Sequence, residues 1–113
     1  MKKLIVLFCL GFFLFGCKDT KKEVSELEKL MNENDYTILD VRTKAEYNEG
    51  HLVGAINIPY DEIDENVNLD KEKLILIYCK SGKRSSIAFS TLSDLGFNVY
   101  DMGAFINIDL PKE

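Results

Sequence analysis

The sequence lacks the residue clusters that would place several common functions. Its 113 residues include one histidine, and no group of histidine, cysteine and carboxylate side chains has the spacing of metal ligands. The histidine, His51, lies in a Gly-His-Leu-Val-Gly turn, which favours a structural role over general-base catalysis. Internal repeats and low-complexity tracts are also missing. We therefore expect neither a metal nor another cofactor.

An excess of positive charge is lacking as well. The chain carries 14 basic and 19 acidic residues, and its formal net charge is -5. This balance argues against nucleic-acid binding and against electrostatic adhesion to anionic lipid. The length leaves room for one small domain, which we expect to be a monomer.

No apolar run is long enough to span a bilayer as a stable helix. Residues 4–15 are apolar, follow Lys2 and Lys3, and lead into Gly16 and Cys17. This pattern resembles a bacterial lipoprotein signal, with residues 1–16 as signal peptide. The resemblance implies cleavage after Gly16, a lipid on Cys17 and an envelope protein anchored to a membrane outside the cytoplasm. The alternative is an uncleaved signal anchor in which Cys17 is an ordinary thiol.

Few cysteines remain after such processing. Cys9 leaves with the signal peptide and Cys17 is acylated, so Cys79 is left without a disulfide partner. Loss of Lys2 and Lys3 also reduces the basic residues to 12 and brings the net charge to -7. An unpaired thiol in an oxidising compartment needs an explanation, and a chemical role for Cys79 is the simplest one.

The rest of the chain alternates helical and strand patterns. After a polar tether over residues 17–22, residues 23–113 form the expected domain. Capping-box patterns at Thr20/Glu23 and Thr43/Glu46 predict two helix starts. We expect helices at residues 23–34, 44–49 and 86–95, a helical turn near residue 63, and strands at residues 36–41, 55–58, 74–78 and 98–102. Alternation of this kind predicts an α/β fold: a small parallel sheet flanked by helices on both faces.

The main candidate for chemistry is the stretch 74–86, where an apolar strand ends at Cys79 and a basic turn with Gly82 follows. A thiol is nucleophilic as its thiolate, and cations or a helix N-terminus lower its pKa. Lys80, Lys83 and Arg84 supply cations, and the same turn would hold a persulfide or an anionic substrate such as thiosulfate. The alternative is a buried strand-end cysteine followed by a solvated basic turn.

Three motifs together resemble the rhodanese-like sulfurtransferases of the single-domain type. They are Asp40-Val41-Arg42, the run from Glu46 to Pro59, and the loop from Cys79 to Arg84, within a similarity that covers residues 36–108. The resemblance implies transfer of sulfur from a small anionic donor to a thiol or cyanide acceptor. A persulfide on Cys79 is the implied intermediate.

The resemblance also implies roles for the neighbouring residues. Arg84 would bind the donor's anionic oxygens, and the remaining substrate-binding positions are Lys80, Ser81, Gly82 and Lys83. Lys80 and Lys83 are equally compatible with solvated loop lysines. Asp40 would brace the active-site loop, and Arg42 would pair nearby, with Glu46 as a candidate partner.

Two other functions share features with a thiol in an anion-binding loop. Cysteine-type phosphatases place five residues between cysteine and arginine, whereas four separate Cys79 from Arg84, and a shorter loop suits a sulfur atom better than a phosphoryl group. A non-catalytic rhodanese-like binding module is the second rival. Inactive members usually lose the cysteine, which this chain keeps.

Overall fold

The computed structural model describes residues 25–113, which fall into two units divided between Glu33 and Asn34. The first unit contributes the helix α3 (Ser25–Glu33), with Glu26 and Glu28 in its first turn. Acidic side chains there interact favourably with the helix dipole. Helix α3 ends at Glu33, one residue before the predicted end at residue 34. The predicted capping box of Thr20 and Glu23 lies outside the described residues. Within residues 25–113, no helix has the length and apolarity needed to cross a membrane.

The second unit is built on a four-stranded parallel sheet with the order β2-β1-β3-β4. The strands are β1 (Tyr36–Asp40), β2 (Ile56–Asn57), β3 (Leu74–Cys79) and β4 (Val99–Ala104). The central strand β3 reads Leu-Ile-Leu-Ile-Tyr-Cys and is buried from Ile75 onward. A continuous apolar run is typical of a parallel strand covered on both sides.

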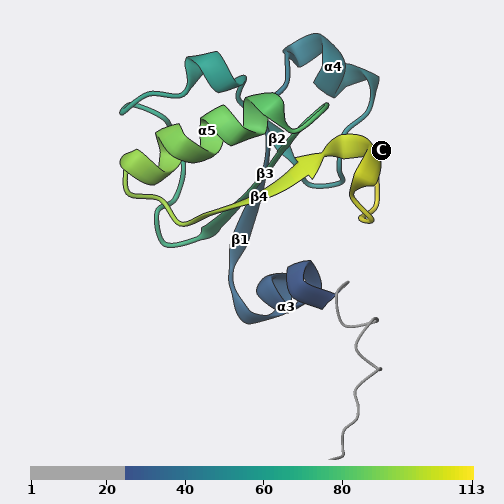
Figure 1. Ribbon diagram of the computed structural model, residues 1–113, viewed down its shortest axis with the longest axis horizontal. Helices are drawn as coiled ribbons and strands as arrows, with labels where there is room; N and C mark the ends of the chain where they lie inside the picture. The colour runs from purple at the N-terminus through teal and green to yellow at the C-terminus, as the bar shows by residue number, and fades with distance from the viewer. Residues whose placement is uncertain (1–24) are drawn as a thin grey trace, which may run out of the picture. The chain divides into compact units, whose positions relative to one another are not determined.

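Helical elements lie on both faces of this sheet (Figure 1). Helix α5 (Lys83–Asp94) and the 3₁₀ turn η4 (Tyr60–Glu62) belong to the face that contains Ile77 and Cys79. On the other face, Phe105 of the short η5 (Phe105–Asn107) stacks on Tyr78, with 5.5 Å between ring centroids. The predicted α/β class is confirmed. Core residues of the α5 face include Leu39, Val41, Ile75, Ile77, Ala88, Leu92 and Phe97.

Helix α4 (Lys44–Glu49) has the predicted bounds because its start is encoded locally. The amide of Glu46 donates to Thr43 Oγ1 over 3.2 Å, and the amide of Thr43 donates to Glu46 Oε1 over 3.0 Å. This reciprocal capping box satisfies two of the amides that a helix start leaves unpaired. The spacing of Thr43 and Glu46 therefore fixes the start of the helix at Lys44.

Helix α5 begins at Lys83, three residues before the predicted start at Ser86. Its N-cap is Gly82, whose φ of 99° lies in the left-handed region that glycine adopts readily, and no side chain caps it. Lys83 and Arg84 are thus in the first helical turn. The loop between strand and helix shrinks to residues 80–82.

Strand β4 contains an irregularity opposite the end of β3. Ile77 pairs with Asp101, but Tyr78 pairs with Gly103, so Met102 is an extra residue on β4. Gly103 has φ of 88°, and its amide donates to Asp101 Oδ1 over 2.9 Å. This arrangement is a β-bulge, and β4 continues to Ala104 rather than ending at the predicted residue 102.

Candidate active site

The Cys79 thiol lies at the carboxyl end of β3, directly before the N-terminus of α5. Its Sγ accepts hydrogen bonds from the amides of Gly82, over 3.0 Å, and Ser85, over 3.2 Å. Ser85 is the third residue of the helix, and its amide is one that a capping side chain would normally bind. The Cys79 side chain is fully buried. Cys79 thus supplies the cap that α5 otherwise lacks.

Several hydrogen bonds control the pKa of this thiol. Burial raises the pKa, and it is the largest single effect. The Ser85 side chain, whose hydroxyl donates to the Gly82 carbonyl over 3.1 Å, and the amides of Ser85, Gly82 and Ser81 all favour the thiolate. Together they leave the pKa of Cys79 below its usual value. These contacts therefore favour the nucleophilic thiolate form of the buried Cys79.

Arg84 forms a two-pronged ion pair with Glu46 of α4. Its Nη1 and Nη2 lie 2.8 Å and 3.1 Å from the two carboxylate oxygens. The Arg84 hydrogen bonds hold the pKa of Glu46 at about 2, and the same bonds raise the pKa of Arg84. The negative charge of Cys79 also favours charged Arg84, so the guanidinium is in electrostatic range of the thiolate.

The other predicted substrate-binding residues have different surroundings. Lys80, Ser81 and Lys83 are exposed, and Gly82 is half-buried. Lys80 lines a cavity, whereas Ser81 and Gly82 act on Cys79 through backbone amides. Within residues 25–113, no interaction assigns Lys83 to the site.

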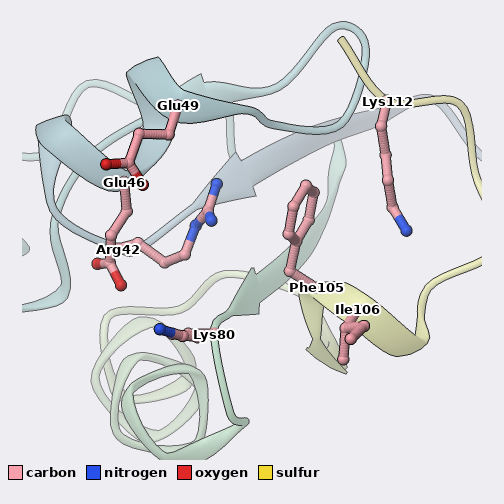
Figure 2. A pocket seen from close by; sticks show the side chains of 7 residues that line it. All are labelled: Arg42, Glu46, Glu49, Lys80, Phe105, Ile106 and Lys112. Carbon is pink, nitrogen blue, oxygen red and sulfur yellow. The ribbon is translucent and has the colours of Figure 1, made fainter.

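A cavity of about 420 Å³ adjoins this loop (Figure 2). Its walls combine the apolar side chains of Phe105 and Ile106 with charged groups from several elements. Figure 2 shows these side chains around a common space, with Arg42 and Phe105 near its centre. Cys79 does not line the cavity, but Lys80, the next residue, does. The lining residues are Arg42, Glu46, Glu49, Lys80, Phe105, Ile106 and Lys112.

A buried polar cluster lies on the opposite side of β3 from Cys79. Asp40 accepts two hydrogen bonds from Arg42 Nε, over 2.9 and 3.1 Å, and one from Arg42 Nη2, over 2.6 Å. Its Oδ2 also accepts from the Tyr78 hydroxyl over 2.8 Å, and that hydroxyl accepts from the amide of Leu52 over 3.0 Å. Arg42 Nη2 further donates to the carbonyl of Gly50 over 2.7 Å.

This cluster changes the predicted roles of Asp40 and Arg42. Asp40 holds Tyr78, the residue before Cys79, and no hydrogen bond joins its carboxylate to residues 80–84. The suggested pairing of Arg42 with Glu46 is wrong, because Arg42 pairs with Asp40 and Glu46 pairs with Arg84. Burial lowers the pKa of Arg42, but Asp40 outweighs it and leaves the pKa raised.

Sequence reasoning missed the roles of Tyr78 and Ser85. The sequence pattern predicts a helix from residue 86, but Ser85 is already the third helical residue, which brings its amide to Cys79. A polar tyrosine in an otherwise aliphatic strand was the available signal for Tyr78, because a buried hydroxyl needs partners.

His51 has structural contacts, in line with the sequence interpretation. Its ring stacks on Tyr47, with centroids 3.8 Å apart, and Nδ1 lies 2.8 Å from the Tyr47 carbonyl oxygen. Nε2 lies 3.2 Å from Glu113 Oε2. The imidazole thus joins α4 to the tail, and none of these contacts reaches Cys79.

The fold and the site define a small α/β protein organised around one activated thiol. Residues 23–105 match the model of the rhodanese-like domain, and the chain belongs to this family. Thiosulfate sulfurtransferase PspE of Escherichia coli is 36% identical over 78 residues, which cover 66% of this chain and 75% of that protein. Thiosulfate sulfurtransferase GlpE of Coxiella burnetii is 34% identical over 85 residues, covering 72% and 79%.

Solved structures agree with this assignment. A rhodanese with anions from E. coli superimposes with a TM-score of 0.63 at 32% identity, covering 69% of this chain and 96% of that one. A rhodanese-related protein from Thermoplasma volcanium gives 0.62 at 34% identity, covering 74% and 82%.

Proposed function

We propose that the protein is a sulfurtransferase that carries sulfur as a persulfide on Cys79. The observation that carries this proposal is the pair of amide hydrogen bonds from Gly82 and Ser85 to a buried Sγ of lowered pKa. Amides that stabilise a thiolate also suit the terminal sulfur of a persulfide anion. The relatives named thiosulfate sulfurtransferases support the same function.

The reaction takes two displacement steps. The Cys79 thiolate attacks the outer sulfur of the donor, the donor's sulfur–sulfur bond breaks, and its remainder leaves with the electron pair. With thiosulfate the leaving group is sulfite. A cyanide or thiolate acceptor then attacks the outer sulfur of the persulfide, and Cys79 departs as a thiolate. Neither step requires a metal or another cofactor.

Access to the thiol is a condition of this chemistry. Because the Cys79 side chain is fully buried, a donor reaches Sγ only when neighbouring side chains give way. Arg84 is suited to this movement, because it is part-exposed, is in electrostatic range of the thiolate, and has a charge that attracts an anionic donor. We assign donor binding to Arg84 on this basis.

Intact-mass measurement after incubation with thiosulfate tests the function. We expect a gain of one sulfur atom on the wild-type protein, its loss on addition of cyanide, and no gain in Cys79→Ser. No gain with thiosulfate or with organic persulfides would contradict the enzyme and favour a binding module. A gain that persists in Cys79→Ser would contradict the site, and hydrolysis of a phosphate ester would favour the phosphatase.

The N-terminal pattern supports a second proposal, concerning location. Residues 1–24 lie outside the described residues, and the proposal rests on Lys2, Lys3, the apolar run and Cys17 in the sequence. We propose that Cys17 carries a lipid that anchors a monomeric domain to a bacterial membrane on its extracytoplasmic side.

A further inference from the structure

The guanidinium assigned to the donor is already occupied by a carboxylate of the same chain. Arg84 donates to both oxygens of Glu46, and both side chains are about one-quarter exposed. Glu46 is itself fixed, because its Oε1 accepts from the amide of Thr43 over 3.0 Å and from the Thr43 hydroxyl over 3.1 Å. A small anion that binds the same two N–H groups of Arg84 must displace a positioned competitor.

Such competition lowers the affinity of every ligand that displaces Glu46 from Arg84. An ion pair that is partly exposed contributes up to about 1 kcal/mol, which corresponds to roughly a five-fold change in apparent affinity. Thiosulfate has few atoms and little surface with which to compensate. A larger donor loses the same free energy at Arg84 but offsets it with binding energy from contacts elsewhere.

The cavity beside the pair provides those additional contacts. Its volume of about 420 Å³ is within the range of pockets that hold organic ligands and far exceeds the needs of thiosulfate. Phe105 and Ile106 offer apolar surface. The three cations of the lining, which include Lys80 and Lys112, outnumber its two glutamate carboxylates, so its formal charge is positive. Among residues 25–113, neither lysine forms an ion pair.

Lys112 is held at the cavity by the backbone around it. The amide of His51 donates to the Glu113 carbonyl over 3.0 Å, and the amide of Glu113 donates to the His51 carbonyl over 2.8 Å. Lys112 itself forms an antiparallel bridge with Leu52, and its Nζ lies 5.0 Å from the Phe105 ring centroid. Its charge is therefore presented beside the apolar wall.

We propose that the cavity binds the body of an organic persulfide that bears carboxylate groups, and that Glu46 restricts Arg84 from small inorganic anions. This substrate class rests on the sulfurtransferase function proposed above. The Cys79 thiolate attacks the outer sulfur of R–S–SH, and the bond between the two donor sulfurs breaks. The thiolate RS⁻ leaves with the electron pair, and the transferred SH group forms the Cys79 persulfide.

Two donor persulfides and thiosulfate test the cavity. Glutathione persulfide carries carboxylates, whereas the persulfide of 2-mercaptoethanol is small and carries none. The rate of single-sulfur mass gain is measured against donor concentration on the full chain. We expect Lys112→Gln to raise the half-saturating concentration of glutathione persulfide about two-fold to five-fold, with little change for the other two donors. Lys44→Gln, an exposed lysine of α4 outside the cavity, is the matched control.

Glu46→Gln tests the restriction on Arg84. Glutamine keeps the capping box but removes the charge that competes for Arg84. We expect the half-saturating thiosulfate concentration to fall about two-fold to five-fold. Glu65→Gln makes the same change in net charge at an exposed position and is expected to leave it unchanged.

The outcomes separate this proposal from the function beneath it. Mass gain with thiosulfate, combined with equal effects of Lys112→Gln on all three donors or with none, would overturn the cavity as a donor site. Equal effects of Glu46→Gln and Glu65→Gln would overturn the role of Glu46. Failure of all three donors to add sulfur would instead refute the sulfurtransferase function, and this proposal with it.

Discussion

Cys79 has two structural roles. It is the last residue of β3, and its sulfur accepts a hydrogen bond from an amide in the first turn of α5. Helix starts are usually capped by the oxygen of serine, threonine, aspartate or asparagine. A thiolate in that place receives the same amides and also the positive end of the helix dipole. Local folding and activation of the nucleophile therefore depend on the same contacts.

Replacing Ser85 by alanine should raise the pKa of the Cys79 thiol. The Ser85 side chain favours the thiolate. Its hydroxyl donates to the Gly82 carbonyl over 3.1 Å, which stabilises the turn that presents the Gly82 and Ser85 amides to Sγ. The wild-type thiol should therefore ionise at a lower pH than the thiol of Ser85→Ala. The measurement is the pH dependence of the rate of alkylation by iodoacetamide.

Ser86→Ala is the control for this change, because Ser86 is the next residue and is exposed. Its alkylation profile should coincide with that of the wild type. A midpoint for Ser85→Ala that is unchanged, or that moves to lower pH, would refute the role of the Ser85 hydroxyl.

Side-chain pairings were the least predictable feature at this scale. Cys79 and Arg84 stand out in the sequence because a thiol, a glycine and several cations are contiguous. Glu46 pairs with Arg84, 38 positions away, and no local spacing favours Arg84 over the nearby Arg42 as its partner. Arg42 does not compete for Glu46 in the structure, because it pairs with Asp40, two residues before it in the sequence.

Strands β1 and β3 are joined by more than their backbone ladder. Asp40 and Tyr78 occupy paired positions of the two strands, and the Tyr78 hydroxyl connects the Asp40 carboxylate to the amide of Leu52. Burial raises the pKa of Tyr78 well above its usual value, so the hydroxyl stays protonated and continues to donate. The strand that carries Cys79 is thereby held against β1 and the turn at Leu52.

Tyr78→Phe should lower the free energy of unfolding by about 1–3 kcal/mol, the cost of leaving buried polar groups without a partner. The substitution keeps the ring but removes the acceptor for Leu52 and one donor to Asp40. Urea denaturation followed by circular dichroism measures the change.

Tyr36→Phe is the matched substitution, because the Tyr36 side chain at the start of β1 is exposed. It should change stability by less than about 0.5 kcal/mol. Equal losses in the two variants would show that the Tyr78 hydroxyl contributes nothing specific.

Elements with local signals were predicted well. The capping box at Thr43 and Glu46 placed α4 at its observed bounds, and the apolar run placed β3 within one residue. The start of α5 was missed because sequence rules look for an oxygen cap, whereas this helix uses the sulfur of Cys79. The catalytic candidate and the capping group are the same residue, Cys79, and a search for oxygen caps alone does not find this helix start.

At the scale of the whole molecule, the acidic chain needs an attachment other than charge to stay at a membrane. Its net charge is -5, or -7 without Lys2 and Lys3, and anionic lipid would repel it. The lipid proposed for Cys17 would supply that attachment through buried acyl chains.

Cys17→Ala should therefore move the protein from the membrane fraction to the soluble fraction when it is expressed in a bacterial host. The measurement is immunoblotting of both fractions after high-salt washing, which removes proteins held by charge alone. Cys79→Ala, which also removes one thiol, should remain with the membrane. Retention of Cys17→Ala in the washed membranes would refute acylation as the anchor.

The bulge at Met102 makes the strands unequal in their tolerance of length changes. Side chains of a strand alternate between faces, so losing one residue reverses every later side chain. In β4, deleting Met102 would make Asp101 and Gly103 consecutive, so that they would pair without interruption with Ile77 and Tyr78 of β3. Deletion of one residue from β3 before Tyr78 would instead exchange the faces of Tyr78 and Cys79. The phenol would then lie at the start of α5 and the thiol at the Asp40 cluster. The edge strand β4 can therefore lose one residue and keep its later side chains on their faces, whereas the central strand β3 cannot.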